Sequence, residues 1–330
     1  MTSPGPAVSI ADIRAAAGRI DGLAVRTPLI ESPGLNARTG GRILLKAECL
    51  QRTGSFKFRG AYNRISQLDP ATTPGGVVAY SSGNHAQGVA AAAQLMGLPA
   101  VIAMPSDTPA IKRRNTEGYG ADVVSFDRAR EDREEIARAI AAERGAVIVP
   151  PFDDVDIIAG QGTAGLEIVA QAQALGAVPD AVLVCHGGGG FTAGVATAVK
   201  DAVPDAAVYG VEPEGFDDLV RSLASGRRER NARGTGSICD ALLAWSPGEI
   251  TFGINRQLLA GALAVSDDEV RAAMAFAFES LKLVVEPGGA VALAAVLSGR
   301  IDCRGRTVVA VLSGGNVDRD AFHAALAAAG

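Results

Sequence analysis

Lys57 has the surroundings of a nucleophilic lysine. It lies between Phe56 and Phe58 in a segment with a glycine near each end, residues 51–61 (QRTGSFKFRGA). A lysine between two aromatic rings is poorly solvated, and desolvation lowers the pKa of its ammonium group. A lysine that is partly neutral near pH 7 can form a Schiff base with a carbonyl compound. A snorkelling surface lysine in the first turn of a helix is the alternative, and this segment alone favours that alternative.

A second polar segment is formed by Ser81, Ser82, Gly83, Asn84 and His85. It follows a predicted apolar strand at residues 76–80 and runs into a predicted alanine-rich helix at residues 84–96. The first N–H groups of a helix have no intrahelical partner, so such a junction binds anions such as a carboxylate. An ordinary helix cap needs only one such side chain. The cluster therefore predicts a loop that binds an anion such as a carboxylate.

A third segment consists of four consecutive glycines, Gly187, Gly188, Gly189 and Gly190. They follow a predicted strand at residues 181–185 and precede a predicted helix at residues 192–201. Without Cβ atoms, the backbone N–H groups of such a loop can approach a phosphate closely. No lysine follows at the position that a P-loop requires, so the loop is not of the Walker A type.

The same glycines also match a dinucleotide fingerprint. Gly188, Gly190 and Ala193 have the required spacing, and Glu212 follows about 20 residues later, where a nicotinamide site needs an acidic side chain. This segment alone is compatible with a nicotinamide-dependent oxidoreductase. That interpretation gives no role to Lys57 or to the segment at residues 81–85.

Strand and helix patterns alternate along the chain. Further strands are predicted at residues 100–104, 122–126, 147–149, 207–211 and 307–312, and further helices at residues 110–119 and 128–144. Repeated strand–helix–strand units predict parallel sheets that are covered by helices.

Composition excludes several functional classes. Hydrophobic residues make up 48% of the 330 residues and charged residues 20%, which is typical of a globular protein with a large core. The net charge is −5 and the only basic run is short (RRER, residues 227–230), so we expect no nucleic-acid partner. No membrane span or signal peptide is visible. Four scattered cysteines predict reduced thiols and a cytoplasmic protein.

The three segments, together with residues 151–154 (PFDD), 158–163 (IAGQGT) and 313–316 (SGGN), resemble a known family. This family is the pyridoxal-phosphate enzymes of the serine/threonine dehydratase and serine racemase group. The order and spacing of these segments agree with those of the family over nearly the whole chain. The resemblance implies an α/β fold of type II (tryptophan synthase beta-like), with two open, twisted, mainly parallel sheets, helices on both faces and an active site between domains.

The resemblance also implies a domain arrangement and an assembly. A small domain of residues 52–150 is expected as an insertion in a large domain of residues 1–51 and 151–330. No C-terminal regulatory domain is expected, because the chain ends soon after the segment at residues 313–316. A homodimer is the expected assembly.

By resemblance, individual residues receive roles in binding pyridoxal 5′-phosphate and a small amino acid. Lys57 would bind the cofactor and remove the Cα proton of the substrate, and the segment at residues 81–85 would bind the substrate carboxylate. The remaining cofactor-binding residues are expected to be Phe56, Asn84, Gly187, Gly188, Gly189, Gly190, Glu286 and Ser313.

Two serines bear on the choice of reaction. A hydroxyl such as that of Ser313 is too weak an acid to protonate the cofactor's pyridine nitrogen, which favours prompt β-elimination over transamination. By the same resemblance, Ser82 would lie on the cofactor face opposite Lys57. Its hydroxyl could deliver or remove a proton there, which would permit racemisation or the use of substrates with the other Cα configuration.

The predicted activity is β-elimination of water from β-hydroxy amino acids, with L-threonine and L-serine first, to give a 2-oxo acid and ammonia. The alternatives are a threo-3-hydroxyaspartate dehydratase and a serine racemase. A hydroxyaspartate site would need an arginine or histidine for the second carboxylate, and the sequence alone does not place one.

The resemblance implies a divalent cation as well. Its ligands would be the Glu212 carboxylate, the Phe216 carbonyl oxygen and the Asp218 carboxylate, an oxygen set that suits Mg²⁺ or Ca²⁺. A solvated acidic loop is the alternative interpretation of this segment.

Overall fold

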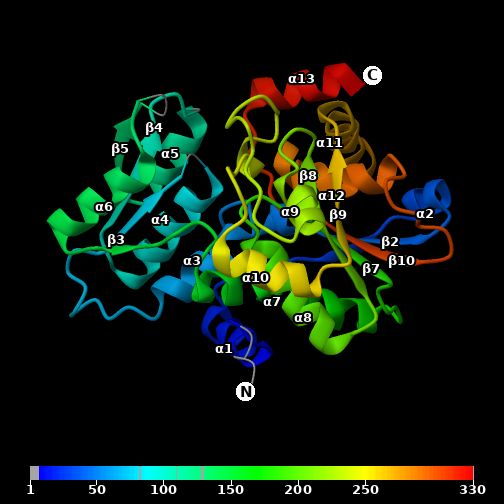
Figure 1. Cartoon of the computed structure of the whole chain (residues 1–330), viewed down its shortest axis with the longest axis horizontal. Coiled ribbons are helices and arrows are strands. Elements are labelled where there is room, and N and C mark those ends of the chain that lie inside the picture. Colours follow the sequence, from blue (N-terminus) through cyan, green and yellow to red (C-terminus); the bar gives the residue numbers. More distant parts are fainter. Residues whose placement is uncertain (1–6, 82, 109, 128–129, 330) are drawn as a thin grey trace.

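The structure is a computed structural model that describes residues 7–81, 83–108, 110–127 and 130–329. Two separate sheets form its framework, one of six strands and one of four. Figure 1 shows the strands β3 to β5 on one side of the molecule and β7 to β10 on the other, with helices packed around both sheets.

The larger sheet combines strands from both ends of the chain. Its order is β1-β2-β10-β7-β8-β9, in which β1 is antiparallel to β2 and every other pair is parallel. The strands are β1 (Leu29–Glu31), β2 (Arg42–Lys46), β10 (Thr307–Val311), β7 (Ala181–Cys185), β8 (Ala207–Pro213) and β9 (Gly261–Val265).

The smaller sheet comes from one continuous part of the chain and is entirely parallel. Its order is β5-β4-β3-β6. The strands are β5 (Asp122–Phe126), β4 (Ala100–Pro105), β3 (Val77–Tyr80) and β6 (Val147–Ile148). Two mainly parallel sheets covered by helices confirm the predicted fold class.

The helices cover the faces of both sheets. They are α1 (Ile10–Ile20), α2 (Pro33–Thr39), α3 (Lys57–Ile65), α4 (Asn84–Met96), α5 (Ala110–Gly118), α6 (Arg133–Arg144), α7 (Val155–Ala174), α8 (Gly190–Ala202), α9 (Asp218–Ser225), α10 (Glu249–Leu258), α11 (Asp267–Leu281), α12 (Pro287–Leu297) and α13 (Arg319–Ala329). Two short 3₁₀ helices are η1 (Glu48–Leu50) and η2 (Asp240–Leu242). No helix in these described ranges combines the length and the apolar character needed to cross a bilayer.

Helix α6 begins later than the sequence pattern predicted. The side chain of Asp132 accepts hydrogen bonds from the backbone N–H groups of Glu134 and Glu135, which makes Asp132 the N-cap. Capping of this kind satisfies donors that would otherwise lack partners, so it determines where the helix starts. As a result, Arg133 is the first residue of α6.

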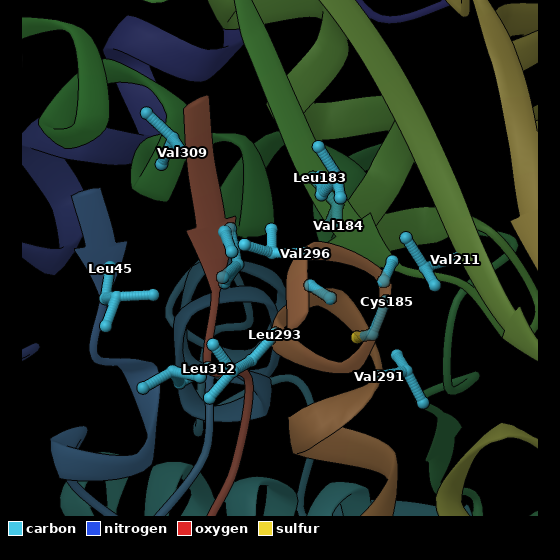
Figure 2. Close-up of a cluster of buried hydrophobic side chains, with 14 of the residues drawn as sticks. Leu45, Leu183, Val184, Cys185, Val211, Val291, Leu293, Val296, Val309 and Leu312 are labelled. Carbon is cyan, nitrogen blue, oxygen red and sulfur yellow. The ribbon is translucent and has the colours of Figure 1, made fainter. Parts of the chain in front are cut away.

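The core of the larger sheet is built around α12. This helix is buried on all its faces and contacts β7, β8, β9 and β10. Figure 2 shows Val291, Leu293 and Val296 of α12 among strand side chains such as Leu183 and Val309. Continuous apolar runs are typical of parallel strands that are covered on both faces.

Helix α3, which begins with Lys57, is held close to α7. A Cβ atom at Gly160 of α7 would lie 2.6 Å from the carbonyl oxygen of Arg59, and one at Gly60 of α3 would lie 2.8 Å from that of Ile157. Only glycine permits such a close approach of two helix backbones. The paired glycines therefore determine the position of α3 and of the lysine at its start.

A buried ionic network lies close to this crossing. The Arg59 guanidinium donates to Glu48 (2.8 Å) and to Glu167 (2.7 Å), and the Lys46 ammonium group donates to Glu167 (2.6 Å). The side chains of Lys46, Glu48 and Arg59 are completely buried. Because buried charges are tolerated only when they are paired, the network ties β2, η1, α3 and α7 together.

Candidate active site

Most of the predicted site residues gather in one cavity at the carboxyl ends of strands from both sheets. Tyr80 ends β3 and Ser81 follows it, Cys185 ends β7, and Ser313 follows β10; all four line the cavity. The carboxyl ends of parallel strands are the usual ligand-binding edge of such sheets. The cavity therefore brings together segments that are more than 200 residues apart in the chain.

Lys57 enters this cavity from the first turn of α3. Its Nζ donates a hydrogen bond of 2.6 Å to the carbonyl oxygen of Pro151 and lies 5.3 Å from the ring centroid of Phe56. Burial lowers the pKa of Lys57 to about 8. The chain reaches α3 through a tight turn in which Thr53 and Gly54 have φ values of 72° and 71°.

The expectation that two phenylalanines enclose Lys57 is correct for only one of them. Phe56 lines the cavity and stacks on Phe191 of α8, with ring centroids 3.9 Å apart. The ring of Phe58 instead packs in the core, where its centroid lies 5.7 Å from that of Tyr62. In a helix, neighbouring side chains point in different directions, which separates Phe58 from the site.

The four glycines, residues 187–190, form a bare stretch of backbone along the cavity wall, from the end of β7 to the first residue of α8. Gly189 has a φ of 94°, a conformation that favours glycine. A Cβ atom at Gly188 would lie 2.2 Å from the ring of Phe152. The loop ends at the N-terminus of α8, where backbone N–H groups lack intrahelical partners.

The predicted substrate loop lines the same cavity through Ser81, Gly83, Asn84 and His85. Ser82 lies outside the described residues. The N–H of Gly83 donates to Ser81 Oγ (3.2 Å), and Nε2 of His85 lies 2.9 Å from the carbonyl oxygen of Val149. Burial lowers the pKa of His85 to about 3, so the imidazole is neutral at pH 7.

Asn84 connects this loop to two other segments of the wall. Its Nδ2 donates to Glu286 Oε1, and its Oδ1 accepts a hydrogen bond of 2.7 Å from Asn316. The second carboxylate oxygen of Glu286 is buried and has no hydrogen-bond partner in the described structure. Burial raises the pKa of Glu286 to about 7. The carboxyl group thus lies in the cavity wall with one oxygen left for a ligand.

Ser313 lines the same wall as the glycine loop and Glu286. Its carbonyl oxygen accepts from the N–H of Phe56 (3.1 Å), which joins the end of β10 to the start of α3. Its hydroxyl interacts with the thiol of Cys185, whose pKa is raised by burial to about 11. Position 313 thus offers the cavity a neutral hydroxyl and no acidic group.

The cavity also contains charged residues that the sequence did not single out. Lys112 of α5 donates a hydrogen bond of 2.5 Å to Asp240 of η2. Arg133, at the start of α6, lines the cavity with its guanidinium carbon 5.5 Å from the Tyr80 ring centroid. Lys112 and Arg133 lie in charged helix patterns that look like ordinary solvated faces, so no signal in a single sequence distinguishes them.

With this geometry described, comparison with known proteins identifies the family. The family model described as "Pyridoxal-phosphate dependent enzyme" matches residues 20–314. The chain belongs to this family. The family match also decides against the nicotinamide interpretation of the glycine loop.

Several pyridoxal-phosphate dependent enzymes resemble the chain over almost its whole length. An L-threo-3-hydroxyaspartate ammonia-lyase from Pseudomonas sp is 44% identical over 96% of this chain and 97% of its own length. The crystal structure of a threonine deaminase from T.th. has a TM-score of 0.89 at 48% identity, covering 94% of this chain and 99% of that one. Maize serine racemase has a TM-score of 0.91 at 37% identity, covering 97% of both chains.

The residues present fit the cofactor of this family. The cavity contains a lysine with a lowered pKa, whose neutral amine can react with the aldehyde group of pyridoxal phosphate. It contains a glycine loop with space next to bare backbone, as a phosphate group needs. It also contains a buried Glu286 oxygen without a partner. The individual roles of these residues remain predictions.

The predicted cation ligands lie apart from the cavity, around the start of α9. The carboxylate of Glu212 accepts from the N–H groups of Leu219 (2.9 Å) and Val220 (3.1 Å). Asp218 accepts a hydrogen bond of 2.6 Å from Asn231 through Oδ1, while its Oδ2 is buried without a partner. In the described ranges, no three His, Cys, Asp or Glu side chains form a metal-binding group, so a cation here would depend on the Phe216 carbonyl and on water.

Proposed function

We propose that this enzyme removes water from β-hydroxy amino acids, L-threonine and L-serine among them, and releases a 2-oxo acid and ammonia. The single observation that carries this proposal is the cavity that Lys57, the glycine loop and Ser313 line together. Relatives named as hydroxyaspartate and threonine ammonia-lyases support the same reaction class.

When bound, pyridoxal phosphate supplies an electron sink for the Cα carbanion of the substrate. Lys57 is the proposed base for the Cα proton, because its pKa of about 8 makes the neutral amine available near that pH. The carbonyl oxygen of Pro151 orients this amine through the 2.6 Å hydrogen bond. Phe56 lies against the amine on one side and limits its contact with water.

The segment at residues 81–85 is proposed to bind the substrate carboxylate. Gly83 is the N-cap of α4, and the helix that follows offers N–H groups without intrahelical partners. His85 is neutral in this surrounding and does not add a positive charge. We assign Ser82 to proton exchange on the cofactor face opposite Lys57. In this role it would determine how much racemisation accompanies elimination.

Ser313 supports elimination rather than transamination. A serine hydroxyl can donate a hydrogen bond to a ring nitrogen but is too weak an acid to protonate it. With a neutral ring, the charge left at Cα when Lys57 removes the proton would be less stabilised. This would favour prompt loss of the β-hydroxyl as water, protonated by the cofactor phosphate or by a nearby side chain. Glu286, whose pKa burial raises to about 7, is partly protonated at neutral pH and interacts with the cofactor ring in this proposal.

Arg133 favours a second candidate substrate, threo-3-hydroxyaspartate. It lines the cavity, and in the described part of the chain it forms no ion pair. A cation without a carboxylate partner at the edge of a substrate cavity is the group that a β-carboxylate requires. Lys112, a further cation that lines the cavity, is already paired with Asp240.

The divalent cation remains part of the proposal. Glu212 and Asp218 are both buried, and Asp218 Oδ2 lacks a partner, which a cation at this position would provide. Mg²⁺ or Ca²⁺ would be bound by these two carboxylates, the Phe216 carbonyl oxygen and water.

The domain limits, assembly and location also stay proposals. We propose a small domain of residues 52–150, which contains the four-stranded sheet, inside a large domain of residues 1–51 and 151–330. The proposed homodimer would cover exposed apolar side chains such as Phe278 and Val284. Four free, buried cysteines are compatible with a cytoplasmic protein.

The test is release of 2-oxo acid and ammonia by the cofactor-loaded enzyme. The substrates would be L-threonine, L-serine, D-serine and both threo-3-hydroxyaspartate enantiomers, each with Mg²⁺ or with EDTA. Turnover of L-threonine or L-serine supports the first candidate, and turnover confined to hydroxyaspartate supports the second. A cofactor-loaded enzyme that releases no 2-oxo acid from any of them contradicts both.

A further inference from the structure

Two side chains of α10 donate hydrogen bonds to backbone carbonyl groups of the glycine loop. The hydroxyl of Thr251 donates a hydrogen bond of 2.7 Å to the carbonyl oxygen of Gly188. The Nδ2 of Asn255 donates a hydrogen bond of 3.2 Å to the carbonyl oxygen of Gly189. Thr251 and Asn255 are four residues apart, which places them on one face of the helix, and both are completely buried.

Holding these carbonyl groups also orients the N–H groups that follow them. A peptide unit is planar and trans, so its N–H points opposite to its C=O. Since the carbonyl groups of Gly188 and Gly189 point toward α10, the N–H groups of Gly189 and Gly190 point away from it. The loop lines the cavity, and these N–H groups are therefore directed to the cavity side.

The close approach of α10 depends on the absence of a side chain at position 189. A Cβ atom at Gly189 would lie 2.8 Å from Asn255 Nδ2 and 3.0 Å from Thr251 Oγ1. The positive φ of Gly189 likewise disfavours other residues. The absence of side chains in the glycine loop thus permits the close approach of α10 and also leaves bare backbone along the cavity.

Helix α10 is itself fixed to the cavity wall. Asp153 accepts hydrogen bonds from the N–H groups of Glu249 (2.9 Å), Ile250 (2.9 Å) and Thr251 (3.1 Å) at the start of the helix. The preceding residue, Phe152, packs its ring against Gly188. Consecutive side chains therefore contact the loop and the helix that supports it.

We propose that Thr251 and Asn255 are positioning residues for the cofactor phosphate. They do not touch the phosphate. Together with the N–H groups of Gly248 and Ala193, which donate to the same two carbonyl oxygens (3.2 and 2.9 Å), they hold two peptide planes of the glycine loop. The N–H groups of Gly189 and Gly190 then face the phosphate before it binds. The proposal rests on the proposed function only for the identity of the cofactor, and not for the reaction.

The test separates the phosphate from the rest of the cofactor. Apoprotein would be titrated with pyridoxal phosphate and with pyridoxal, which lacks the phosphate, and binding would be followed by visible absorbance. We expect Thr251→Val to raise the Kd for pyridoxal phosphate by about threefold to tenfold, the worth of one hydrogen bond, and to leave the Kd for pyridoxal within about twofold. Thr251→Ser keeps the hydroxyl and should retain wild-type affinity.

Asn255→Ala provides a second, independent variant with the same expected pattern. Thr197→Val is the matched control, because the Thr197 hydroxyl also donates to a backbone carbonyl, that of Ala193 (2.9 Å), but inside α8. Thermal unfolding of each apoprotein shows which variants are folded. Equal loss of affinity for both ligands, or no loss for either in both folded variants, overturns the proposal. No amino acid is present, so an inactive but cofactor-binding enzyme would contradict the proposed reaction and not this inference.

Discussion

The ammonium group of Lys112 lies 2.5 Å from a carboxylate oxygen of Asp240, and both side chains line the cavity. Lys112 belongs to α5, which packs beside β5 of the smaller sheet, whereas Asp240 belongs to η2, which contacts α12 in the larger sheet's core. Burial alone would lower the pKa of Lys112, but Asp240 and Glu286 outweigh it and raise the pKa. The pair therefore joins the two parts of the molecule and leaves Arg133, among the described residues that line the cavity, as a cation without a carboxylate partner.

Replacement of Arg133 should change substrate preference. We expect Arg133→Leu to lower kcat/KM for threo-3-hydroxyaspartate by about tenfold or more, the worth of a hydrogen bond to a charged group. The value for L-serine, which has no β-carboxylate, should change far less. Steady-state kinetics with both substrates would measure this difference.

Arg138→Leu is the matched control for this prediction. Arg138 lies on the same helix, is exposed, and forms an i,i+4 pair with Glu134 at 3.8 Å. It should leave both substrates unaffected. A parallel loss for both substrates in the Arg133 variant would mean that Arg133 supports the fold of the cavity and does not select the substrate.

The rate at which the apoprotein reacts with pyridoxal phosphate should depend on pH. The neutral amine of Lys57 is the reactive form, and burial lowers the pKa of this residue to about 8. Protonation therefore suppresses the reaction below pH 8, and the rate should rise as pH increases through about 8 and then level. Stopped-flow absorbance after mixing apoprotein with pyridoxal phosphate would measure it. A rise that continues toward about pH 10 would show that Lys57 is solvated like an ordinary lysine.

Strands β3 to β8 and β10 were predicted from short, mostly apolar runs that alternate with helical patterns, whereas β1, β2 and β9 were not predicted. Two site segments were predictable because each closely follows such a strand: residues 81–85 follow β3 and residues 187–190 follow β7. Their meeting in one cavity follows from the shared carboxyl edge of parallel strands.

Support from distant residues was not predictable. Thr251 and Asn255 are an ordinary hydroxyl and amide in an amphipathic helix, and only the folded chain brings them to the glycine loop. The same is true of Arg133 and of Lys46, whose charge in a single sequence suggests a surface. For Phe58 the sequence predicted a contact that the fold does not make. Phe58 follows Lys57 in the chain, but its ring packs in the core and not in the cavity.

Disruption of the buried ionic network should strongly destabilise the protein. Arg59→Met would leave Glu48 buried without its main partner, since Arg59 donates to both of its carboxylate oxygens at 2.8 Å. Removing one member of a buried pair costs about 3–5 kcal/mol of unfolding free energy. Arg304→Met is the control, because Arg304 pairs with Asp302 on the exposed surface and should cost less than about 1 kcal/mol. Urea unfolding would measure both; equal, small effects would show that water reaches Glu48.

A side chain at Gly188 should disturb cofactor binding. The Cβ atom of Gly188→Ala would lie 2.2 Å from the Phe152 ring, so either the ring or the loop must move. We expect the Kd for pyridoxal phosphate to rise by about tenfold or more, as for other steric changes that misplace a binding group by about 1 Å. Absorbance titration of the apoprotein would measure the change.

Two further variants identify the contact responsible. Gly253→Ala is the control, because a Cβ atom at this helical position on α10 meets no atom within 4 Å, and the change should stabilise the helix by roughly 0.5–1 kcal/mol. Phe152→Ala combined with Gly188→Ala removes the colliding ring and should recover part of the lost affinity. If the double variant binds no better than Gly188→Ala alone, the bare backbone of the loop is needed by the phosphate itself, and contact with Phe152 is secondary.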